Sequence, residues 1–451
     1  MNPAIFREYD IRGLAEKDFD RAFALLLGKV HGTGISERGG KRVALGRDCR
    51  PTSDGYAEEV IAGLLAIGLH VYDLGVCPTP VLYFSLFHLD LDGGIQITAS
   101  HNPSEYNGFK LCVGKETLYG EQIQNIRRKM EREEFREKPG GKVERYEIVP
   151  PYQKHLLNDV PKLKRPLKIV IDAGSGVGGP IAPPIFRHLG CTVWEIACTP
   201  DGRFPVHHPD PTVPENLDML ITRVRQENAD LGIAYDGDAD RLGAVDEKGN
   251  ILWGDELLVL FSRDVLQRNP NAVVISEVKC SQNLYDDIAK RGGTPVMWKA
   301  GHSLLKAKLK ETRALLAGEM SGHMFFADRY FGYDDAIYAS LRLVELVANS
   351  GRPLSTLLAD LPPSVSTPEI RVDCPDDRKF LIAERAKDYF RKYYDVIDID
   401  GVRVKFPEGW GLIRASNTQP ALVLRFEARS SAKLKEYRDI IERKLKELES
   451  G

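Results

Sequence analysis

The sequence predicts an α/β protein with three related α/β domains that contain mixed sheets, followed by a smaller α+β domain. Three observations lead to this prediction. A length of 451 residues corresponds to roughly three domains, give or take one. A strand, helix, glycine and second strand occur in that order three times, and each occurrence leads to a polar loop. The last part of the chain lacks this pattern and ends in an amphipathic segment.

The three repeats have the spacing of parallel β-strands joined by a helix. The first strands lie at 42–46, 168–172 and 272–275, and their partners at 68–72, 190–194 and 292–297. About 25 residues separate the two strands of a repeat, the length that a βαβ crossover requires. The strands are continuously apolar, which is typical of sheets covered by helices on both faces.

The C-terminal region predicts a different kind of domain. Residues 361–368 are rich in Pro, Ser and Thr, a composition that indicates a linker. Short strands follow, and a closing helix is predicted from apolar residues at helical spacing, namely Leu434, Tyr437, Ile441, Leu445 and Leu448. We therefore expect four domains, over residues 1–148, 149–250, 251–364 and 365–451.

Composition excludes several classes of protein. A net charge of −3 and a pI of about 6.4 provide no electrostatic basis for binding nucleic acid or an anionic membrane. The seven cysteines are odd in number and include no Cys-x-x-Cys pair, which argues against disulfides or structural zinc and favours a reducing cytosol. The first residues lack a signal-peptide core, and the longest apolar stretch, 60–72, is too short to span a bilayer. We expect a cytoplasmic protein, either monomer or dimer.

The loop at residues 98–103 contains the first candidate for chemistry. Ser100, His101 and Asn102 follow an apolar strand, and Lys110 lies shortly beyond. A serine hydroxyl with cations and donors nearby can act as a nucleophile or carry a phosphoryl group. The alternative is an ordinary polar turn closed by Asn-Pro.

The loop at 236–241 predicts a metal site. Asp236, Asp238 and Asp240 project to one side if the backbone is extended. Two such charges about 4 Å apart repel by roughly 4 kcal/mol at an effective dielectric constant of 20, so a cation is needed. All-oxygen ligands favour Mg²⁺ over zinc. An acidic surface turn is the alternative, while an EF-hand is excluded because Arg241 replaces its required glycine.

Two further loops predict sugar and phosphate binding. In 318–323, Glu319 and Ser321 can hold vicinal hydroxyls, because a carboxylate accepts two hydrogen bonds. In 414–420, the Arg414 guanidinium stands beside hydroxyl and amide donors, as in a phosphate site. Either loop, taken alone, could be an ordinary polar turn. Lys279 and His302 end the two strands of the third repeat, so we expect them to contact phosphate or hydroxyls.

One glycine motif suggests a rival function. Residues 174–179 fit G-x-G-x-x-G, follow a strand and precede Glu195 at a distance typical of a nicotinamide-dependent dehydrogenase. Three prolines at 180, 183 and 184 crowd the helix start, where free N–H groups are needed to bind a pyrophosphate. A turn that packs closely on the sheet is the alternative. We interpret His207 and His208 as loop residues rather than a metal pair.

Taken together and in this order, the four loops and residues 6–13 resemble the α-D-phosphohexomutase family over almost the whole chain. The chain is most similar to the bacterial branch with both phosphomannomutase and phosphoglucomutase activity. Ser-Asn-Thr at 416–418 favours that branch, since phosphoglucosamine mutases usually carry Ser-Gly-Thr-Glu there. Phosphoglucosamine mutase, a metal-dependent sugar phosphatase and an NAD-dependent dehydrogenase are the alternative functions.

The resemblance implies a heart-shaped fold with a central cleft. It implies that hexose 1-phosphate and hexose 6-phosphate interconvert through a phosphoserine and a hexose 1,6-bisphosphate, which also serves as activator. Ser100 would carry the phosphoryl group, and its oxygen together with Asp236, Asp238 and Asp240 would hold one Mg²⁺. Glu319 and Ser321 would hold sugar hydroxyls. The phosphate that is not transferred would bind Arg414, Ser416, Asn417 and Thr418.

The resemblance also implies which other side chains line the cleft: Tyr9, Arg12, His101, Lys110, Arg241, Lys279, His302 and His323. The general base is left open between His101, Lys110 and Arg12. The loops are compatible with both glucose and mannose phosphates as substrates, because these sugars differ at one hydroxyl.

Overall fold

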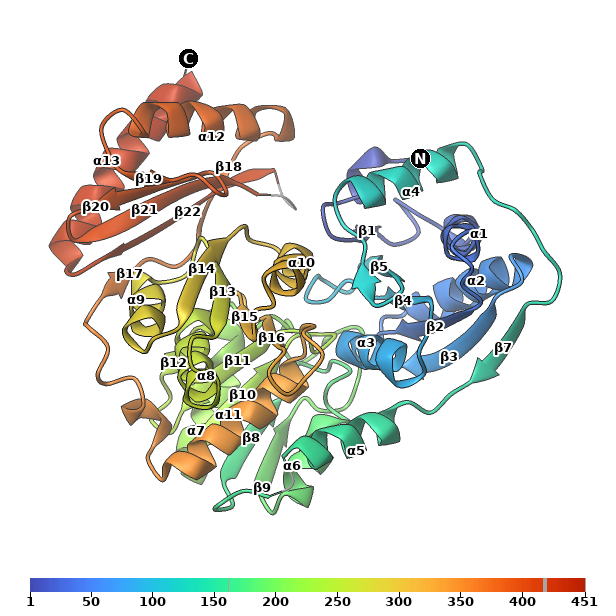
Figure 1. Ribbon diagram of the computed structural model, residues 1–451, viewed down its shortest axis with the longest axis horizontal. Helices are drawn as coiled ribbons and strands as arrows, with labels where there is room; N and C mark the ends of the chain where they lie inside the picture. Colours follow the sequence, from blue (N-terminus) through green and yellow to red (C-terminus); the bar gives the residue numbers. More distant parts are fainter. Residues whose placement is uncertain (161, 417–419, 451) are drawn as a thin grey trace.

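Four separate β-sheets follow one another along the chain and surround a central cleft. The computed structural model describes residues 1–160, 162–416 and 420–450. In Figure 1 the first sheet lies on the right, the second and third lie below, and the fourth lies at the upper left. Three sheets are mixed and the fourth is antiparallel, so the predicted fold class is confirmed. The four domain boundaries stay predictions.

The first sheet has seven strands in the order β1-β5-β4-β2-β3-β7, with β6 beside β5. A short turn of 3-10 helix at Pro3–Ile5 precedes it. The strands are β1 (Ile11–Leu14), β2 (Arg42–Arg47), β3 (His70–Val76), β4 (Gly93–Ile97), β5 (Tyr106–Val113), β6 (Glu116–Thr117) and β7 (Lys142–Arg145). The helices are α1 (Arg21–Ser36), α2 (Ser53–Ala66), α3 (Thr79–His88) and α4 (Glu121–Glu131).

The second and third sheets have the orders β12-β11-β10-β8-β9 and β14-β13-β15-β16. The second comprises β8 (Lys168–Asp172), β9 (Thr192–Ile196), β10 (Leu231–Tyr235), β11 (Leu242–Asp246) and β12 (Ile251–Leu252), with α5 (Val149–Asp159), α6 (Ala182–His188) and α7 (Asp218–Glu227). The third comprises β13 (Val273–Glu277), β14 (Thr294–Trp298), β15 (Leu316–Gly318) and β16 (Met324–Phe326), with α8 (Gly254–Arg268), α9 (Gln282–Lys290), α10 (His302–Thr312) and α11 (Ala336–Ser350).

One four-strand arrangement recurs in these three sheets. The orders β5-β4-β2-β3, β11-β10-β8-β9 and β16-β15-β13-β14 match, and in each the first pair is antiparallel and the others are parallel. The turns from β4 to β5, from β10 to β11 and from β15 to β16 hold the three predicted loops. The repeats are therefore related, and each presents its loop at an equivalent sheet edge.

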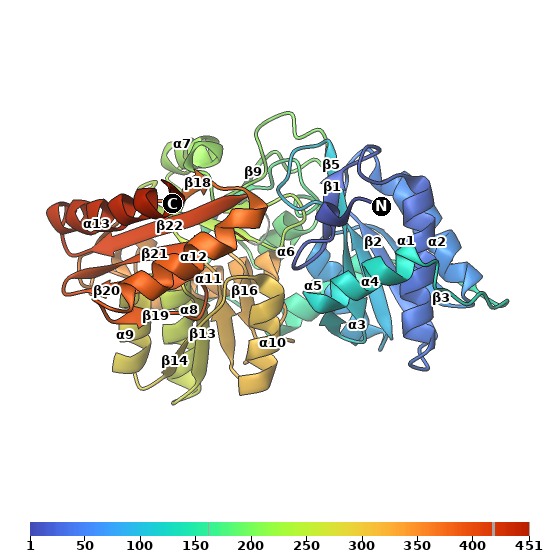
Figure 2. The same cartoon turned by 90° about the horizontal axis from the view of Figure 1, so that it is seen from above.

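The fourth sheet is antiparallel and has its own core. Its strands are β17 (Val365–Ser366), β18 (Ile370–Asp373), β19 (Val396–Ile397), β20 (Val402–Phe406), β21 (Gly409–Ala415) and β22 (Ala421–Ala428). Figures 1 and 2 show α12 (Asp376–Phe390) and α13 (Ser431–Ser450) on the face turned away from the third domain. The five apolar residues predicted for α13 pack in that core.

Two further predictions can be compared with the structure. The linker prediction for 361–368 is wrong at Val365–Ser366, which pair with the edge of β22 because that strand leaves backbone groups open to a partner. All seven cysteines are free thiols, as their number suggested. Among residues 1–160, 162–416 and 420–450, no helix has both the length and the apolar character needed to cross a bilayer.

Candidate active site

Ser100 lies where the first and second domains meet. It sits in the turn from β4 to β5, is only 3% exposed, and has a φ of 51°, a left-handed conformation that costs about 1 kcal/mol for a non-glycine residue. Its backbone N–H donates to Thr98 Oγ1 at 2.9 Å. Its hydroxyl donates to Asp236 Oδ2 at 2.5 Å and lies 3.1 Å from His101 Nδ1. A turn with a strained backbone that holds a buried hydroxyl against a carboxylate is not an ordinary polar turn.

The three aspartates of the turn from β10 to β11 form a buried cluster. A ligand oxygen from each lies within 4.8 Å of the others, and all three side chains are fully buried. Among the residues that the structure describes, Asp238 Oδ1 and Asp240 Oδ1 have no hydrogen-bond partner. Buried carboxylate oxygens without a partner are costly. The set of hard oxygen donors therefore fits a divalent cation such as Mg²⁺.

Lys110 from β5 neutralises part of this cluster. Its Nζ lies 2.8 Å from Asp238 Oδ2 and 2.5 Å from Asp240 Oδ2. Although burial opposes both effects, this pairing raises the pKa of Lys110 and lowers the pKa of Asp238. The pKa of Asp236 is raised by burial and by the two neighbouring carboxylates. The cluster holds more negative charge than one lysine balances.

Arg12 and His101 border the same site. The Arg12 guanidinium donates to Asn102 Oδ1 at 2.8 Å and to Asp10 Oδ2 at 2.5 Å, which ties β1 to the Ser100 loop. Burial, with Arg241 and Arg12 nearby, lowers the pKa of His101 well below its ordinary value. His101 is therefore neutral at physiological pH, whereas Lys110 is charged.

The loop from β15 to β16 faces the serine from the third domain. Glu319 accepts a hydrogen bond from Gly301 N at 2.5 Å and one from Ser321 Oγ at 3.1 Å. His323 lies between Arg241 Nε, 3.1 Å from its Nε2, and Asp334 Oδ2, 3.1 Å from its Nδ1. Carboxylate, hydroxyl and imidazole groups thus meet within one loop, as hydroxyl binding requires.

Two of the predicted phosphate contacts, one from the third domain and one from the fourth, are paired with carboxylates. Arg414 Nε donates to Asp400 Oδ2 at 2.9 Å, and Lys279 Nζ lies 3.1 Å from Glu369 Oε2. Ser416, just beyond β21, is 6% exposed. The predicted Asn417 and Thr418 lie outside the described residues.

These groups share one cavity of about 900 Å³. Tyr9 also reaches it, with its hydroxyl donating to Ala300 O at 2.7 Å and its ring set edge-on to His302. Asp236 and Asp238 do not line the cavity, whereas Ser100, which contacts Asp236, does. The predicted residues on the wall are Tyr9, Arg12, Ser100, His101, Lys110, Asp240, Arg241, Lys279, His302, Glu319, Ser321, His323, Arg414 and Ser416.

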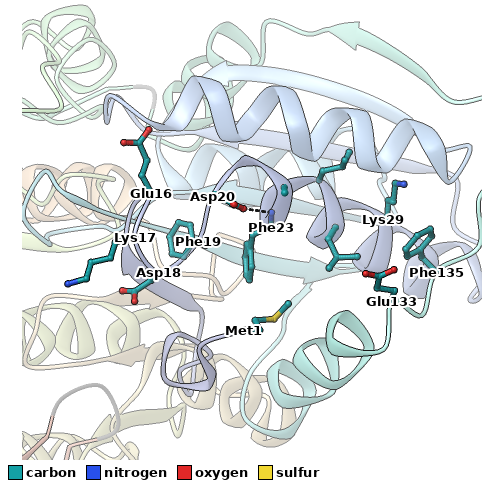
Figure 3. A pocket seen from close by; sticks show the side chains of 13 residues that line it. Met1, Glu16, Lys17, Asp18, Phe19, Asp20, Phe23, Lys29, Glu133 and Phe135 are labelled. Atoms are coloured by element: carbon teal, nitrogen blue, oxygen red, sulfur yellow. Dashed lines mark hydrogen bonds between the residues drawn. The ribbon is translucent and has the colours of Figure 1, made fainter.

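A second, more open hollow lies on the first domain beside this cavity, and Asp18 lines both. It measures about 540 Å³, and Figure 3 shows Phe19 and Phe23 in it, with Lys29, Glu133 and Phe135 at one end. Its lining contains none of the predicted site residues. The chemistry predicted from the sequence therefore belongs to the larger cavity.

Models of four consecutive protein-family domains match the chain. Phosphoglucomutase/phosphomannomutase α/β/α domains I, II and III match residues 3–137, 150–249 and 253–365, and the C-terminal domain of the same family matches 369–444. The chain belongs to the phosphoglucomutase/phosphomannomutase family. The resemblance stated from the four loops is confirmed.

Relatives of this family agree over nearly their full length. A phosphomannomutase/phosphoglucomutase of Pseudomonas aeruginosa is 46% identical, with 99% of this chain and 96% of that protein covered. A phosphoglucomutase of Neisseria gonorrhoeae is 45% identical, with 95% and 94% covered. The crystal structure of a phosphoglucomutase/phosphomannomutase family protein from Burkholderia thailandensis, 43% identical, superposes with a TM-score of 0.92 over 99% of this chain and 98% of that one.

The glycine-rich turn at 174–179 has a packing role in this phosphoglucomutase/phosphomannomutase fold. A Cβ on Gly176 would lie 2.6 Å from Gly237 O, and one on Gly179 would lie 2.2 Å from Cys198 O. The glycines let this turn approach the loop at 236–241 (the metal loop) and the backbone at Cys198. His207 Nε2 donates to the Asp172 carboxylate at 3.0 Å, and both His207 and His208 lie in a loop, as expected.

Several site residues of this family member were missed from the sequence. Thr79 Oγ1 donates to Asp238 Oδ2 at 2.5 Å, and Asp334 links His323 to Lys306, whose Nζ lies 3.0 Å away. Asp400 orients Arg414. None of these belongs to a loop motif, so only the contacts of the folded chain reveal them.

Proposed function

We propose that this chain is a phosphohexomutase that interconverts hexose 1-phosphate and hexose 6-phosphate, of mannose, glucose or both, through a phosphoserine at Ser100. The observation that carries this proposal is the 2.5 Å contact of Ser100 Oγ with Asp236, inside a buried carboxylate cluster that opens onto a wide cleft. The names of the relatives support the choice of sugars.

The carboxylate cluster fits one Mg²⁺. Asp236, Asp238, Asp240 and an oxygen on phosphorylated Ser100 would hold it, and the orphaned oxygens of Asp238 and Asp240 support this assignment. When bound, Mg²⁺ supplies positive charge that stabilises the transferring phosphoryl group. A phosphoserine carries about −1.5 to −2 charges at neutral pH, so it needs nearby positive charge. Lys110 and Arg12 supply fixed positive charge at the same place.

The transfer step exchanges one ester for another. A sugar hydroxyl oxygen forms a bond to phosphorus as the bond from phosphorus to Ser100 Oγ breaks. The hydroxyl proton leaves and Ser100 Oγ gains a proton, so the products are a hexose 1,6-bisphosphate and free Ser100. Return of the other phosphate to Ser100 completes the isomerisation, and added bisphosphate activates enzyme that has lost its phosphoryl group.

The sugar and the remaining phosphate are held by the far side of the cleft. Glu319 would accept hydrogen bonds from sugar hydroxyls, and Ser321 would donate to them or accept from them. The phosphate that is not transferred would bind Arg414 and Ser416, with Asn417 and Thr418. Tyr9, Arg241, Lys279, His302 and His323 would complete the lining. The bisphosphate must turn end for end between steps, so this side must accept two orientations.

The candidates for the general base are His101, Lys110 and Arg12. The pKa of Lys110 is raised by Asp238 and Asp240 against the effect of burial, which argues for Lys110 as a fixed cation. His101 is neutral and lies 3.1 Å from Ser100 Oγ. The free thiols further support a cytoplasmic location, which we also propose.

Two measurements test the proposal. Intact-mass analysis of the purified protein should show a species heavier by one phosphoryl group that Ser100→Ala lacks. Mannose 1-phosphate or glucose 1-phosphate with Mg²⁺ and a trace of the matching bisphosphate should yield the 6-phosphate, and Ser100→Ala should lose at least about four orders of magnitude in rate, the scale of nucleophile removal. Release of inorganic phosphate in place of a 6-phosphate would instead identify a phosphatase. Faster turnover of glucosamine 1-phosphate would identify a phosphoglucosamine mutase.

A further inference from the structure

Arg50 lies beneath the Ser100 loop, just after β2, and its side chain is fully buried. A guanidinium has five N–H donors in a fixed plane. Arg50 places all five: Nε on Asp48 Oδ2 at 3.0 Å, Nη1 on Pro103 O at 2.5 Å and Tyr106 O at 3.1 Å, and Nη2 on Ser100 O at 2.9 Å and Asn102 O at 2.6 Å. Four carbonyl groups of one loop therefore converge on one side chain.

Arg50 is itself held from several sides. Asp48 accepts from Arg50 N and from Ser53 Oγ, and Asn107 donates to Ser53 Oγ at 3.0 Å. The ring of Phe204, from the second domain, covers the guanidinium at 5.0 Å. Because Asp48 balances the charge of Arg50, the main effect of this residue on the loop is geometric.

The conformation of Ser100 needs such support. Its φ of 51° is unfavourable for a residue with a side chain. The Ser100 carbonyl is confined between Arg50 Nη2 and the metal loop, since a Cβ added to Gly237 would lie 2.4 Å from that oxygen. A change in φ rotates the carbonyl and the side chain of Ser100 together about the N–Cα bond, so a carbonyl released to relax φ would also carry Ser100 Oγ away from Asp236.

We propose that Arg50 is the positioning residue that holds Ser100 in its left-handed conformation and so aims its oxygen at the carboxylate cluster. This inference rests on the proposed function of Ser100. Arg50 touches neither substrate nor metal in this role and acts only through the backbone of residues 100–106. Lysine cannot replace it, because an ammonium group has three donors at one point and leaves carbonyls of the loop unsatisfied.

The test compares Arg50→Lys with Arg47→Lys. Arg47 ends the same strand and is also largely buried, but its guanidinium donates to Asp54 and Asp73 instead of to the loop. With kcat expressed per folded molecule, Arg50→Lys should lower kcat about 100-fold, the effect of misplacing a reacting group by about 1 Å. KM should change less than about threefold, because the sugar and phosphate loops lie on other domains. Arg47→Lys should retain the parent kcat.

A purely structural role for Arg50 predicts a different result. The variant would then lose thermal stability while its folded fraction kept a kcat within about threefold of the parent, and that outcome would overturn the proposal. Equal losses in Arg47→Lys and Arg50→Lys would overturn it as well.

Hydrogen exchange separates failure of this inference from failure of the proposed function. Amides of residues 98–107 should exchange faster in Arg50→Lys than in Arg47→Lys, whatever reaction Ser100 performs. Unchanged exchange would contradict the positioning role. Full activity of Ser100→Ala would instead contradict the proposed function and leave the exchange result to decide the role of Arg50.

Discussion

The two sides of the cleft are built differently. The Ser100 loop and the three aspartates belong to the first and second domains. Some of the buried side chains of these two domains share a continuous core with the third domain, although the first domain also has a core of its own. Direct side-chain contacts join them, from Ser100 to Asp236 and from Lys110 to Asp238. The fourth domain has a separate core. It meets the third through a small cluster around Val278, Trp410 and Leu412 and through buried arginines.

The buried arginines show how the fourth domain is attached. Arg403 donates to Val278 O and Cys280 O, at 2.7 and 2.8 Å, and stacks on Trp410. Arg425 Nη1 lies 3.2 Å from Asp255 Oδ2 of the third domain. These are polar contacts around a small apolar patch, unlike the shared core of the other three domains. Interfaces of this kind permit relative motion of domains.

This difference matches what a mutase requires. Phosphoryl transfer needs a fixed centre, since misplacement of the reacting oxygen by about 1 Å is costly. The group that holds the other phosphate must accept the substrate in two orientations and release it between them. We therefore expect substitutions on the Ser100 side to lower kcat and substitutions on the Arg414 side to raise KM.

Apart from removal of the Ser100 hydroxyl itself, the largest effect is expected from Asp238→Asn. This change removes a carboxylate charge while Thr79 and Lys110 still contact the side chain, so folding should be preserved. We expect kcat to fall by about 10²–10³, the scale of losing one electrostatic contact to a transferring group. The Mg²⁺ concentration for half activity should rise, and KM for the sugar phosphate should change little.

The matched control is Asp246→Asn, a buried carboxylate of the same domain that accepts from Lys248 N and Asn250 N. Steady-state kinetics at several Mg²⁺ concentrations would check both variants. If Asp238→Asn kept the Mg²⁺ dependence of the parent, the carboxylate cluster would not be the metal site.

A smaller effect, on KM instead of kcat, is expected from Arg414→Gln. A charge-assisted contact with phosphate contributes about 1.5–3 kcal/mol, which corresponds to a rise in KM of about 10–100-fold. We expect kcat to fall less than about tenfold, since Ser100 and its metal loop keep their geometry. Arg385→Gln, on an exposed part of α12, is the control. A loss confined to kcat would contradict the division of the cleft into two sides.

The sequence predicts the residues that belong to a local pattern and misses those that act through partners elsewhere in the chain. The repeats, the loop positions and the carboxylate spacing are local patterns, so Ser100, Asp236 and Glu319 could be found from strand periodicity and loop composition. Arg50, Asp334 and Asp400 act through partners in other segments of the chain, and no local pattern indicates those contacts. Strand β17 was missed for the same reason, because its pairing with β22 spans about 60 residues.

The smallest effect is expected from Glu369→Gln, at the junction of the third and fourth domains. Lys279, opposed by partial burial, lowers the pKa of Glu369 to about 2. A lowered pKa means that this pair stabilises the folded state fully above the ordinary pKa of a glutamate. The stabilisation is lost as the pH falls toward 2. The side chains of Glu369 and Lys279 are 22% and 12% exposed, so we expect Glu369→Gln to lower the free energy of unfolding by no more than about 1 kcal/mol at pH 7.

Urea unfolding followed by hydrogen exchange in β18 and β22 would measure this loss for the fourth domain. The difference between parent and Glu369→Gln should shrink steadily between pH 5 and pH 3, because the parent glutamate becomes protonated there in the unfolded chain. Glu436→Gln breaks an exposed ion pair with Lys433 on α13 of the same domain and is the control. A difference that stayed constant with pH would mean that the Glu369 carboxylate does not help to attach the fourth domain to the third.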